Sequence, residues 1–158
     1  MSLFKRLLKG KLKLKKTPKQ KGDDDDSGKY YPEESLAIDE RFTNNFRKNG
    51  GKFLYCLDAQ EINEAFDNIL LENNWYEKDV FCINEMLSKK FDGYNLNFTN
   101  NTTATFFLTS CESLISKNGS ILLSSNQIKE KKLDELPINI VIFATTSQFV
   151  ENISEGLR

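Results

Sequence analysis

The feature of this sequence that most constrains its fold is a series of short apolar runs, each followed by a polar turn. The longest run is INIVIFA at 138–144, and shorter runs occupy 52–57, 79–83, 105–108 and 120–124. Apolar runs without polar alternation are typical of strands that are buried on both faces. Such strands belong to parallel sheets, because the crossover connections place helices on each face. The sequence therefore predicts an α/β fold with a mainly parallel sheet and helices on both faces.

The stretches between these runs carry the spacing of amphipathic helices. Phe42 and Phe46 lie four residues apart in the first stretch. Asp58 is placed to cap the second helix, whose apolar stripe includes Phe66. The expected helices lie at 38–48, after Asp58, at 84–89, at 111–117 and from 149 onward. The polar stretch 91–103 is expected to be loop, and 126–137 a surface helix or an irregular turn.

The chain divides into a charged N-terminal tail and a folded body. Residues 1–21 hold nine of the 22 basic residues and none of the 23 acidic ones, and four aspartates follow at 23–26. We interpret residues 1–34 as a disordered tail and 35–158 as one domain. A weak amphipathic anchor on anionic lipid is the alternative for the tail. The body is acidic, which argues against nucleic-acid binding.

The sequence lacks residues that several catalytic and metal centres require. It has no histidine, which excludes zincin, Ser-His-Asp and Cys-His chemistry built from this chain alone. Cys56, Cys82 and Cys111 lie apart among apolar residues, so we expect buried, reduced thiols and no metal site. No apolar run approaches the roughly 20 residues of a transmembrane helix, and no secretory signal is found. We therefore predict a cytoplasmic protein without a cofactor.

Three predicted strands end in the same pattern of four residues. It consists of two Ser or Thr residues, then any residue, then Glu or Gln. The pattern is typical of a capping box, which satisfies the free N–H groups at a helix start. The alternative is that these helix starts also bind an anion, since parallel strands end at one edge of the sheet. On this second interpretation the ligand-binding residues are Thr109, Ser110, Ser124, Ser125, Gln127, Thr145, Thr146 and Gln148. No catalytic residue is predicted.

The second half of the chain has a recognisable order of segments. It comprises SCESLISKNGSILLSS, with a predicted helix at 111–117, the Gly119-Ser120 turn and an apolar strand, and then LPINIVIFATTSQFVENI. This order resembles the central block of the lactate-utilisation (LUD) domain family. The resemblance implies the fold of sugar-phosphate isomerases, glucosamine-phosphate deaminases and CoA-transferases. It also implies a link to L-lactate oxidation, in which a different subunit carries the iron–sulfur clusters.

Two features depart from the pattern of that family. The family usually has an acidic residue before the glycine turn, often Glu-Thr-Gly-Thr, where this sequence has Lys117-Asn118-Gly119-Ser120. If that glutamate is a nucleophile, as related CoA-transferases suggest, Lys117 cannot replace it as an acyl acceptor. The family also continues past the position of Arg158 through a further helix and strand. We therefore expect the domain to be shortened at its C-terminus.

These observations lead to three hypotheses on function. The first is an LUD-like protein linked to lactate utilisation that binds a small anionic metabolite or a partner subunit, without catalysis of its own. The expected partner is the iron–sulfur subunit of a lactate-oxidation system. The second is an enzyme of the isomerase or CoA-transferase type that acts on a phosphorylated sugar or acyl-CoA; the missing histidine and Lys117 argue against it. The third is a purely structural interaction module.

Overall fold

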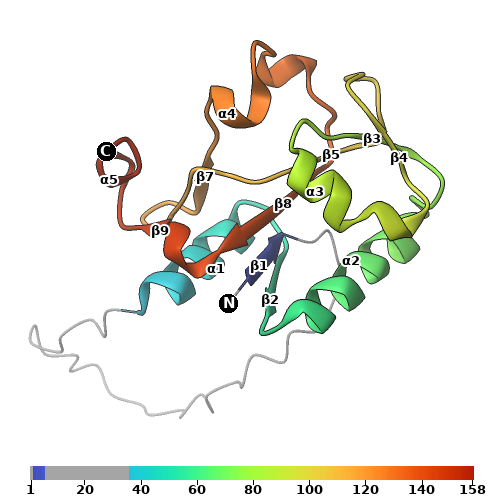
Figure 1. Cartoon of the computed structure of the whole chain (residues 1–158). Coiled ribbons are helices and arrows are strands. Elements are labelled where there is room, and N and C mark those ends of the chain that lie inside the picture. Colours follow the sequence, from blue (N-terminus) through green and yellow to red (C-terminus); the bar gives the residue numbers. More distant parts are fainter. Residues whose placement is uncertain (1, 6–35) are drawn as a thin grey trace, which may run out of the picture.

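A six-stranded sheet forms the centre of the fold (Figure 1). The computed structural model describes residues 2–5 and 36–158, with the backbone alone at 2–5. The strand order is β2-β1-β8-β5-β3-β4. These strands are β1 (Ser2–Lys5), β2 (Phe53–Cys56), β3 (Asp79–Phe81), β4 (Asn97–Thr99), β5 (Phe106–Thr109) and β8 (Ile140–Thr145).

Four neighbouring strands of this sheet run parallel to one another. β8 pairs with β5, β5 with β3 and β3 with β4 in parallel, whereas β1 is antiparallel to β2 and β8. The predicted α/β fold with a mainly parallel sheet is confirmed. β1 consists of residues that the sequence analysis assigned to the disordered tail, so the structure differs from that expectation there. The rest of the predicted tail lies outside the described residues, and the boundary at residue 35 stays a prediction.

Helix α2 (Ala59–Asn73) covers one face of the sheet together with α3 (Glu85–Lys90). As predicted, Asp58 caps α2, and its Oδ1 accepts the N–H of Glu61 at 2.8 Å. Asn84 caps α3 in the same manner, since its Oδ1 accepts the N–H of Met86 at 3.0 Å. The core on this face contains Ile62, Phe66, Ile69 and Leu70 from α2 and Val80, Phe106, Leu108 and Val141 from the strands.

The opposite face is covered at one end by α1 (Ile38–Lys48) and a small second sheet. This sheet has the order β7-β6-β9, in which β6 (Ser113–Ile115) and β7 (Ser120–Leu122) are antiparallel and β9 (Phe149–Val150) is parallel to β6. The rings of Phe42 and Phe46 stack with centroids 5.2 Å apart. They pack against Leu114 of β6 and Ile142 of β8, so helices cover both faces of the main sheet, as predicted.

The other end of that face is covered by the segment that connects β7 to β8. It contains the short helix α4 (Ser125–Ile128) and the 3-10 helix η2 (Leu133–Glu135), which lie above the sheet in Figure 1. Ile128 and Leu136 from this segment pack with Phe81 of β3 and Phe107 of β5. The connection therefore lies over the middle of the parallel part of the sheet.

The expected helix at 111–117 is wrong, because Ser113–Ile115 form the strand β6. Cys111, Leu114 and Ile115 have helical spacing, but Ser113 and Ser116 are buried as well. Ser116 is 0% exposed, and its hydroxyl donates to the carbonyl of Ile38 at 2.8 Å. A segment that is buried on all sides has no polar face for a surface helix. Pairing with β7 and β9 satisfies its backbone instead.

Two polar segments also differ from the expectations. The predicted loop at 91–103 contains the 3-10 helix η1 (Asp92–Tyr94) and the edge strand β4, whose Asn97 amide donates to Asp79 Oδ1 at 2.6 Å. Polar side chains at an exposed edge give no apolar signal. The 3-10 helix η3 (Thr146–Gln148) precedes β9, and the predicted helix from 149 onward is instead β9 and the short helix α5 (Ile153–Gly156). Phe149 pairs with Leu114 of β6, which draws it into a sheet.

Candidate functional site

Glu112 is the residue at which the three predicted strand-end motifs meet. Its Oε1 accepts hydrogen bonds from three side-chain groups, which are Ser124 Oγ, Asn126 Nδ2 at 2.8 Å and Gln127 Nε2 at 3.1 Å. Nε2 of Gln148 reaches the same turn and donates to the carbonyl of Cys111. Motifs that are separated in the sequence are therefore joined around one short turn between β5 and β6.

Two of the three motifs start helices, as the capping interpretation predicts. Oε1 of Gln127 accepts the N–H of Ser124 at 2.7 Å at the start of α4. Oε1 of Gln148 accepts the N–H of Thr145 at 2.9 Å at the start of η3. The third motif starts no helix: the hydroxyl of Thr109 donates to the carbonyl of Ser110 at 3.0 Å, and β6 follows. The expected cap at Thr109 is therefore wrong.

The carboxylate of Glu112 is held in its ionised form by these neighbours. Hydrogen bonds from Ser124, Asn126 and Gln127 lower the pKa of Glu112 below its ordinary value of 4.5. Donors that bond to the charged form of a carboxyl group favour that form. The bonds are also stronger than those to a neutral acceptor. Glu112 thus ties the β5–β6 turn to α4.

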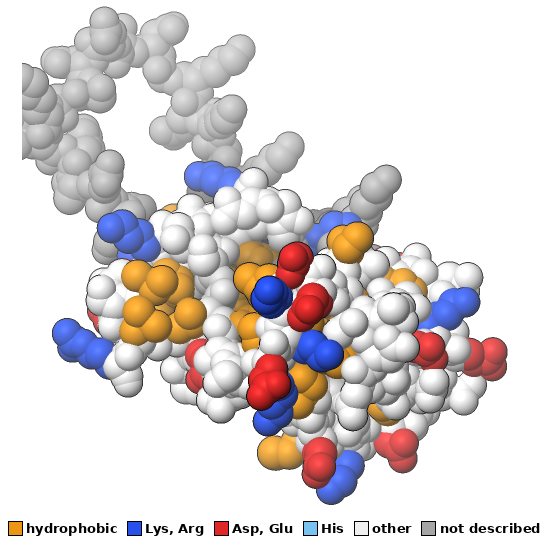
Figure 2. Space-filling view, turned by 90° about the horizontal axis from the view of Figure 1, so that it is seen from above, with side chains coloured by type: hydrophobic (Ala, Val, Ile, Leu, Met, Phe, Trp, Pro, Cys, Tyr) orange, Lys and Arg blue, Asp and Glu red, His pale blue; other side chains and the backbone are white. Residues whose placement is uncertain are grey.

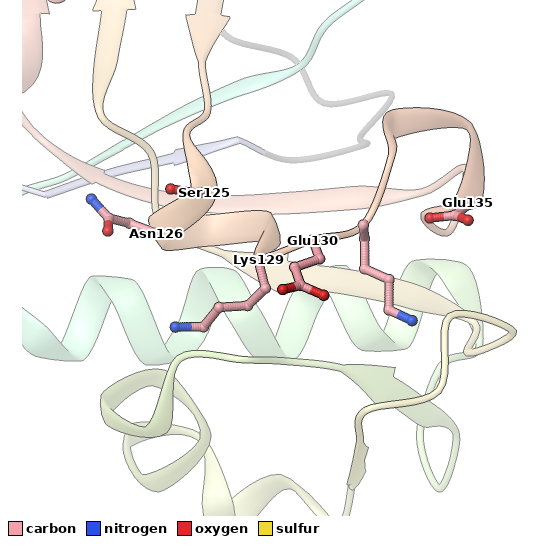
Figure 3. Close-up of a pocket in the computed structure, with 6 residues that line it drawn as sticks. Ser125, Asn126, Lys129, Glu130 and Glu135 are labelled. Atoms are coloured by element: carbon pink, nitrogen blue, oxygen red, sulfur yellow. The ribbon is translucent and has the colours of Figure 1, made fainter.

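A groove lies beside α4. It consists of two cavities that share Lys129 and Lys131, and we call it the α4 groove. The larger cavity has a volume of 720 Å³ and is lined by Ser125, Asn126, Lys129, Glu130, Lys131 and Glu135 (Figure 3). The smaller cavity has a volume of 480 Å³ and is lined in part by Phe81, Cys82, Ile83, Ser88 and Asn100.

The α4 groove lies next to the carboxyl ends of two parallel strands. Phe81 is the last residue of β3, and Asn100 follows directly after β4. Ligands of open α/β folds bind outside this edge of the sheet. Figure 2 views the molecule from the side of α4, where acidic and basic side chains gather around hydrophobic ones near the middle of the face. In Figure 3 the side chains of Asn126 and Lys129 extend from α4 to the same side.

Lys129 has an unusual backbone conformation, with φ 54° and ψ −126°. The carbonyl of Ile128 accepts the N–H of Lys131 at 3.0 Å and closes a tight turn around it. These angles belong to the second residue of a type II′ turn, a position dominated by glycine, asparagine and aspartate. A side chain held in such a conformation costs on the order of 1–3 kcal/mol, and strain of this kind clusters at functional sites.

The structure separates the eight predicted ligand-binding residues into three groups. Ser125 lines the α4 groove, whereas Ser124 and Gln127 face Glu112 behind it. The others lie at neighbouring strand ends and are not among the groove-lining residues; they are Thr109, Ser110, Thr145, Thr146 and Gln148. Lys129 and Lys131 line both cavities and are not among the residues predicted from the sequence. The available signal was the KEKK run at 129–132, directly after a capping box.

The three cysteines are buried and free, as predicted. Burial is the main cause that raises the pKa of the Cys56 and Cys82 thiols to about 11 and that of Cys111 to about 12. Cys82 therefore contributes a neutral thiol to the α4 groove at physiological pH. Among the described residues, no group of three or more Cys, Asp or Glu side chains is placed to hold a metal ion. Within the same residues, no helix has the length and apolar composition needed to cross a membrane.

A comparison with protein families decides which family this sequence represents. The model of the LUD domain matches residues 40–158, from α1 to the last residue. The chain belongs to the LUD domain family. Membership suggests a role related to lactate utilisation. No curated protein and no solved structure matches the chain, so the likeness of this LUD domain to the sugar-phosphate isomerase fold stays a prediction.

Lys117 lies just before the Asn118-Gly119 turn, where the LUD resemblance leads us to expect an acidic residue. It lies exposed in the turn between β6 and β7. Its backbone is held from two sides, because its carbonyl accepts Nδ2 of Asn45 at 3.2 Å and its N–H donates to the carbonyl of Glu151 at 3.0 Å. In this LUD domain the turn therefore joins α1 to the segment after β9.

Proposed function

We propose that this LUD protein binds a small anionic metabolite in the α4 groove, in a role linked to lactate utilisation and without catalysis of its own. The observation that carries the proposal is the position of Lys129, which lines both cavities of the groove in a strained turn. A glycine would fit the turn without strain. We therefore infer that the lysine side chain, which glycine lacks, is the group that binds the ligand.

The chemistry of the groove fits an anion that also carries a hydrogen-bond donor. The ammonium groups of Lys129 and Lys131 attract a carboxylate or phosphate, and the carboxylates of Glu130 and Glu135 line the same cavity. Glu130 lies beside Lys129 (Figure 3), and a carboxylate acts as an acceptor. A 2-hydroxy acid such as lactate offers both groups, a carboxylate for the lysines and a hydroxyl for Glu130.

The proposal is tested by titration of the protein with L-lactate, with neutral lactamide and with inorganic phosphate. We expect lactate and phosphate to raise the melting temperature with increasing concentration, because a ligand stabilises the folded state by RT ln(1 + [L]/Kd). Lactamide should give no shift. Lys129→Gln and Lys131→Gln should each reduce the shift, whereas Lys48→Gln on α1, outside the groove, should keep it. Equal shifts in all three variants would reject the groove as the anion site.

A partner subunit is the second candidate ligand, favoured by a set of exposed apolar side chains. Ile138 is 98% exposed, Met86 80% and Leu133 68%. A partner that covers these side chains would remove their apolar surface from water, which favours association. We propose the iron–sulfur subunit of a lactate-oxidation system as the partner. Ile138→Lys and Leu133→Lys should each prevent co-elution with that subunit, and Leu71→Lys on α2 should not. Co-elution that survives both changes would reject this surface.

A further inference from the structure

The two cavities of the α4 groove differ in chemistry. The larger cavity is lined by polar and charged residues alone. The smaller one has an apolar floor made by Phe81, Cys82 and Ile83 at the end of β3. Lys129 and Lys131 line both cavities and therefore lie where the charged part meets the apolar part. The two lysines thus lie between a charged cavity, which Glu130 and Glu135 also line, and a cavity with an apolar floor.

The apolar floor is preformed by the core of the sheet. Phe81 is 1% exposed, and its ring lies 5.0 Å from that of Phe107 in β5. The N–H of Cys82 donates to the carbonyl of Thr99 at 3.3 Å, so the chain after β3 stays bonded to β4. The thiol of Cys82 is neutral at physiological pH, because burial raises its pKa to about 11. A rigid floor without charge needs little reorganisation when an apolar group covers it.

We propose that the natural ligand is an amphipathic carboxylate with an apolar chain longer than the methyl group of lactate. This inference rests on the proposed function. The carboxylate lies at Lys129 and Lys131, and the chain extends over Phe81, Cys82 and Ile83 into the 480 Å³ cavity. A 2-hydroxy or 2-oxo acid with an alkyl or aryl side chain has this composition. Pockets of about 300–1,000 Å³ suit ligands much larger than a three-carbon acid.

The rim of the smaller cavity limits the length and the end group of the ligand's apolar chain. Ser88 of α3 and Asn100 after β4 line it together with Glu85. A second anionic group at the far end of the ligand would meet the carboxylate of Glu85, which disfavours it. A dicarboxylate of the same length should therefore bind less tightly than the monocarboxylate with a methyl end.

The test measures the affinity of the full chain for a ligand series by calorimetry. The series is lactate, 2-hydroxybutanoate, 2-hydroxypentanoate, 2-hydroxyhexanoate and 3-phenyllactate. Because burial of a methylene in an apolar site is favourable, each added carbon should tighten binding by up to about fourfold. Ile83→Ala should flatten this dependence, because it removes apolar surface from the floor of the smaller cavity. Leu57→Ala, an exposed apolar residue outside the groove, is the matched control and should keep the full dependence.

The outcomes separate this inference from the function on which it rests. If all five acids bind equally, the apolar subsite is rejected while anion binding in the groove stands. If none of them binds, both proposals are rejected. A chain-length dependence that is unchanged in Ile83→Ala would also overturn the placement of the chain over β3. The series is measured first on the unaltered protein, so the result does not depend on the folding of any variant.

Discussion

Gly119 lies directly against the backbone of Phe46. A Cβ atom on Gly119 would be 2.4 Å from the nitrogen of Phe46, and the φ of Gly119 is +71°. The tip of the β6–β7 hairpin therefore contacts α1 without any side chain between them. Asn45 Nδ2 and Asn49 Nδ2 donate to the carbonyls of Ser116 and Asn118 at 2.9 and 2.8 Å, which fixes the hairpin on the helix.

We expect Gly119→Ala to destabilise the domain by about 2–4 kcal/mol, because it adds backbone strain and a steric clash. Gly50→Ala is the matched control, since Gly50 has a φ of +85° but a Cβ atom added there would meet no atom within 4 Å. It should cost about 1–2 kcal/mol, the strain of a left-handed residue alone. Urea denaturation of both variants checks the difference. Equal losses would show that the close approach to Phe46 contributes nothing.

Ile142→Ala should destabilise the domain by about 2–5 kcal/mol, as for other large-to-small changes in a core. Ile142 is 4% exposed in the interior strand β8 and packs with Phe42 and Phe46. Ile138→Ala, four residues earlier in the same apolar run, should change stability by less than about 0.5 kcal/mol, because Ile138 is 98% exposed. Chemical denaturation measures both. A large loss at Ile138 would contradict the position of that residue outside the core.

Lys129→Gly should make the protein more stable and a poorer anion binder at once. Glycine removes the strain of about 1–3 kcal/mol at φ 54° and ψ −126°, partly offset by its own entropy in the unfolded chain. Lys129→Ala keeps the strain and removes the amine, so it should lose binding without the gain in stability. Thermal unfolding and lactate titration of both variants distinguish the two effects. A loss of stability in Lys129→Gly would contradict the strained turn.

The contribution of Glu112 to stability should depend on pH. Its pKa in the folded protein lies below the unfolded value, since Ser124, Asn126 and Gln127 donate to the carboxylate. The stabilisation is therefore complete above the unfolded pKa and is lost as the pH falls through the lower folded pKa.

Urea denaturation between pH 3 and 7 tests this dependence. Glu112→Gln should flatten the acid side of the stability profile and lower stability at neutral pH by about 1–3 kcal/mol, the value of hydrogen bonds to a charged group. Asn126→Ala removes one of the three donors and should give an intermediate profile. If the stability of Glu112→Gln falls at acid pH as much as that of the unaltered protein, another carboxyl group causes the loss.

The sequence by itself determined those helices and strands whose pattern of buried and exposed side chains is the same along their whole length. The stripe from Ile62 to Leu70 predicts α2, and Asp58 marks its first turn, because both signals act within a few residues along the chain. The apolar run that ends in Ala144 predicts β8 for the same reason, since it is buried on both faces. The hydroxyl-Gln pairs of Ser124 and Thr145 are local signals of this kind.

Tertiary structure decided whether a segment is helix or strand where its hydrogen-bonding partners lie far away in the sequence. Leu114 and Ile115 have helical spacing but form β6, because β7 and β9 supply backbone partners that no local pattern encodes. The α4 groove likewise depends on contacts between segments that are distant in the sequence. Lys129 lies in the stretch that was expected to be a surface helix or an irregular turn, and its position beside Phe81 depends on how the connection from β7 to β8 crosses the sheet. Hydrogen bonds and burial between residues far apart in the chain outweigh the small free-energy differences of local propensity.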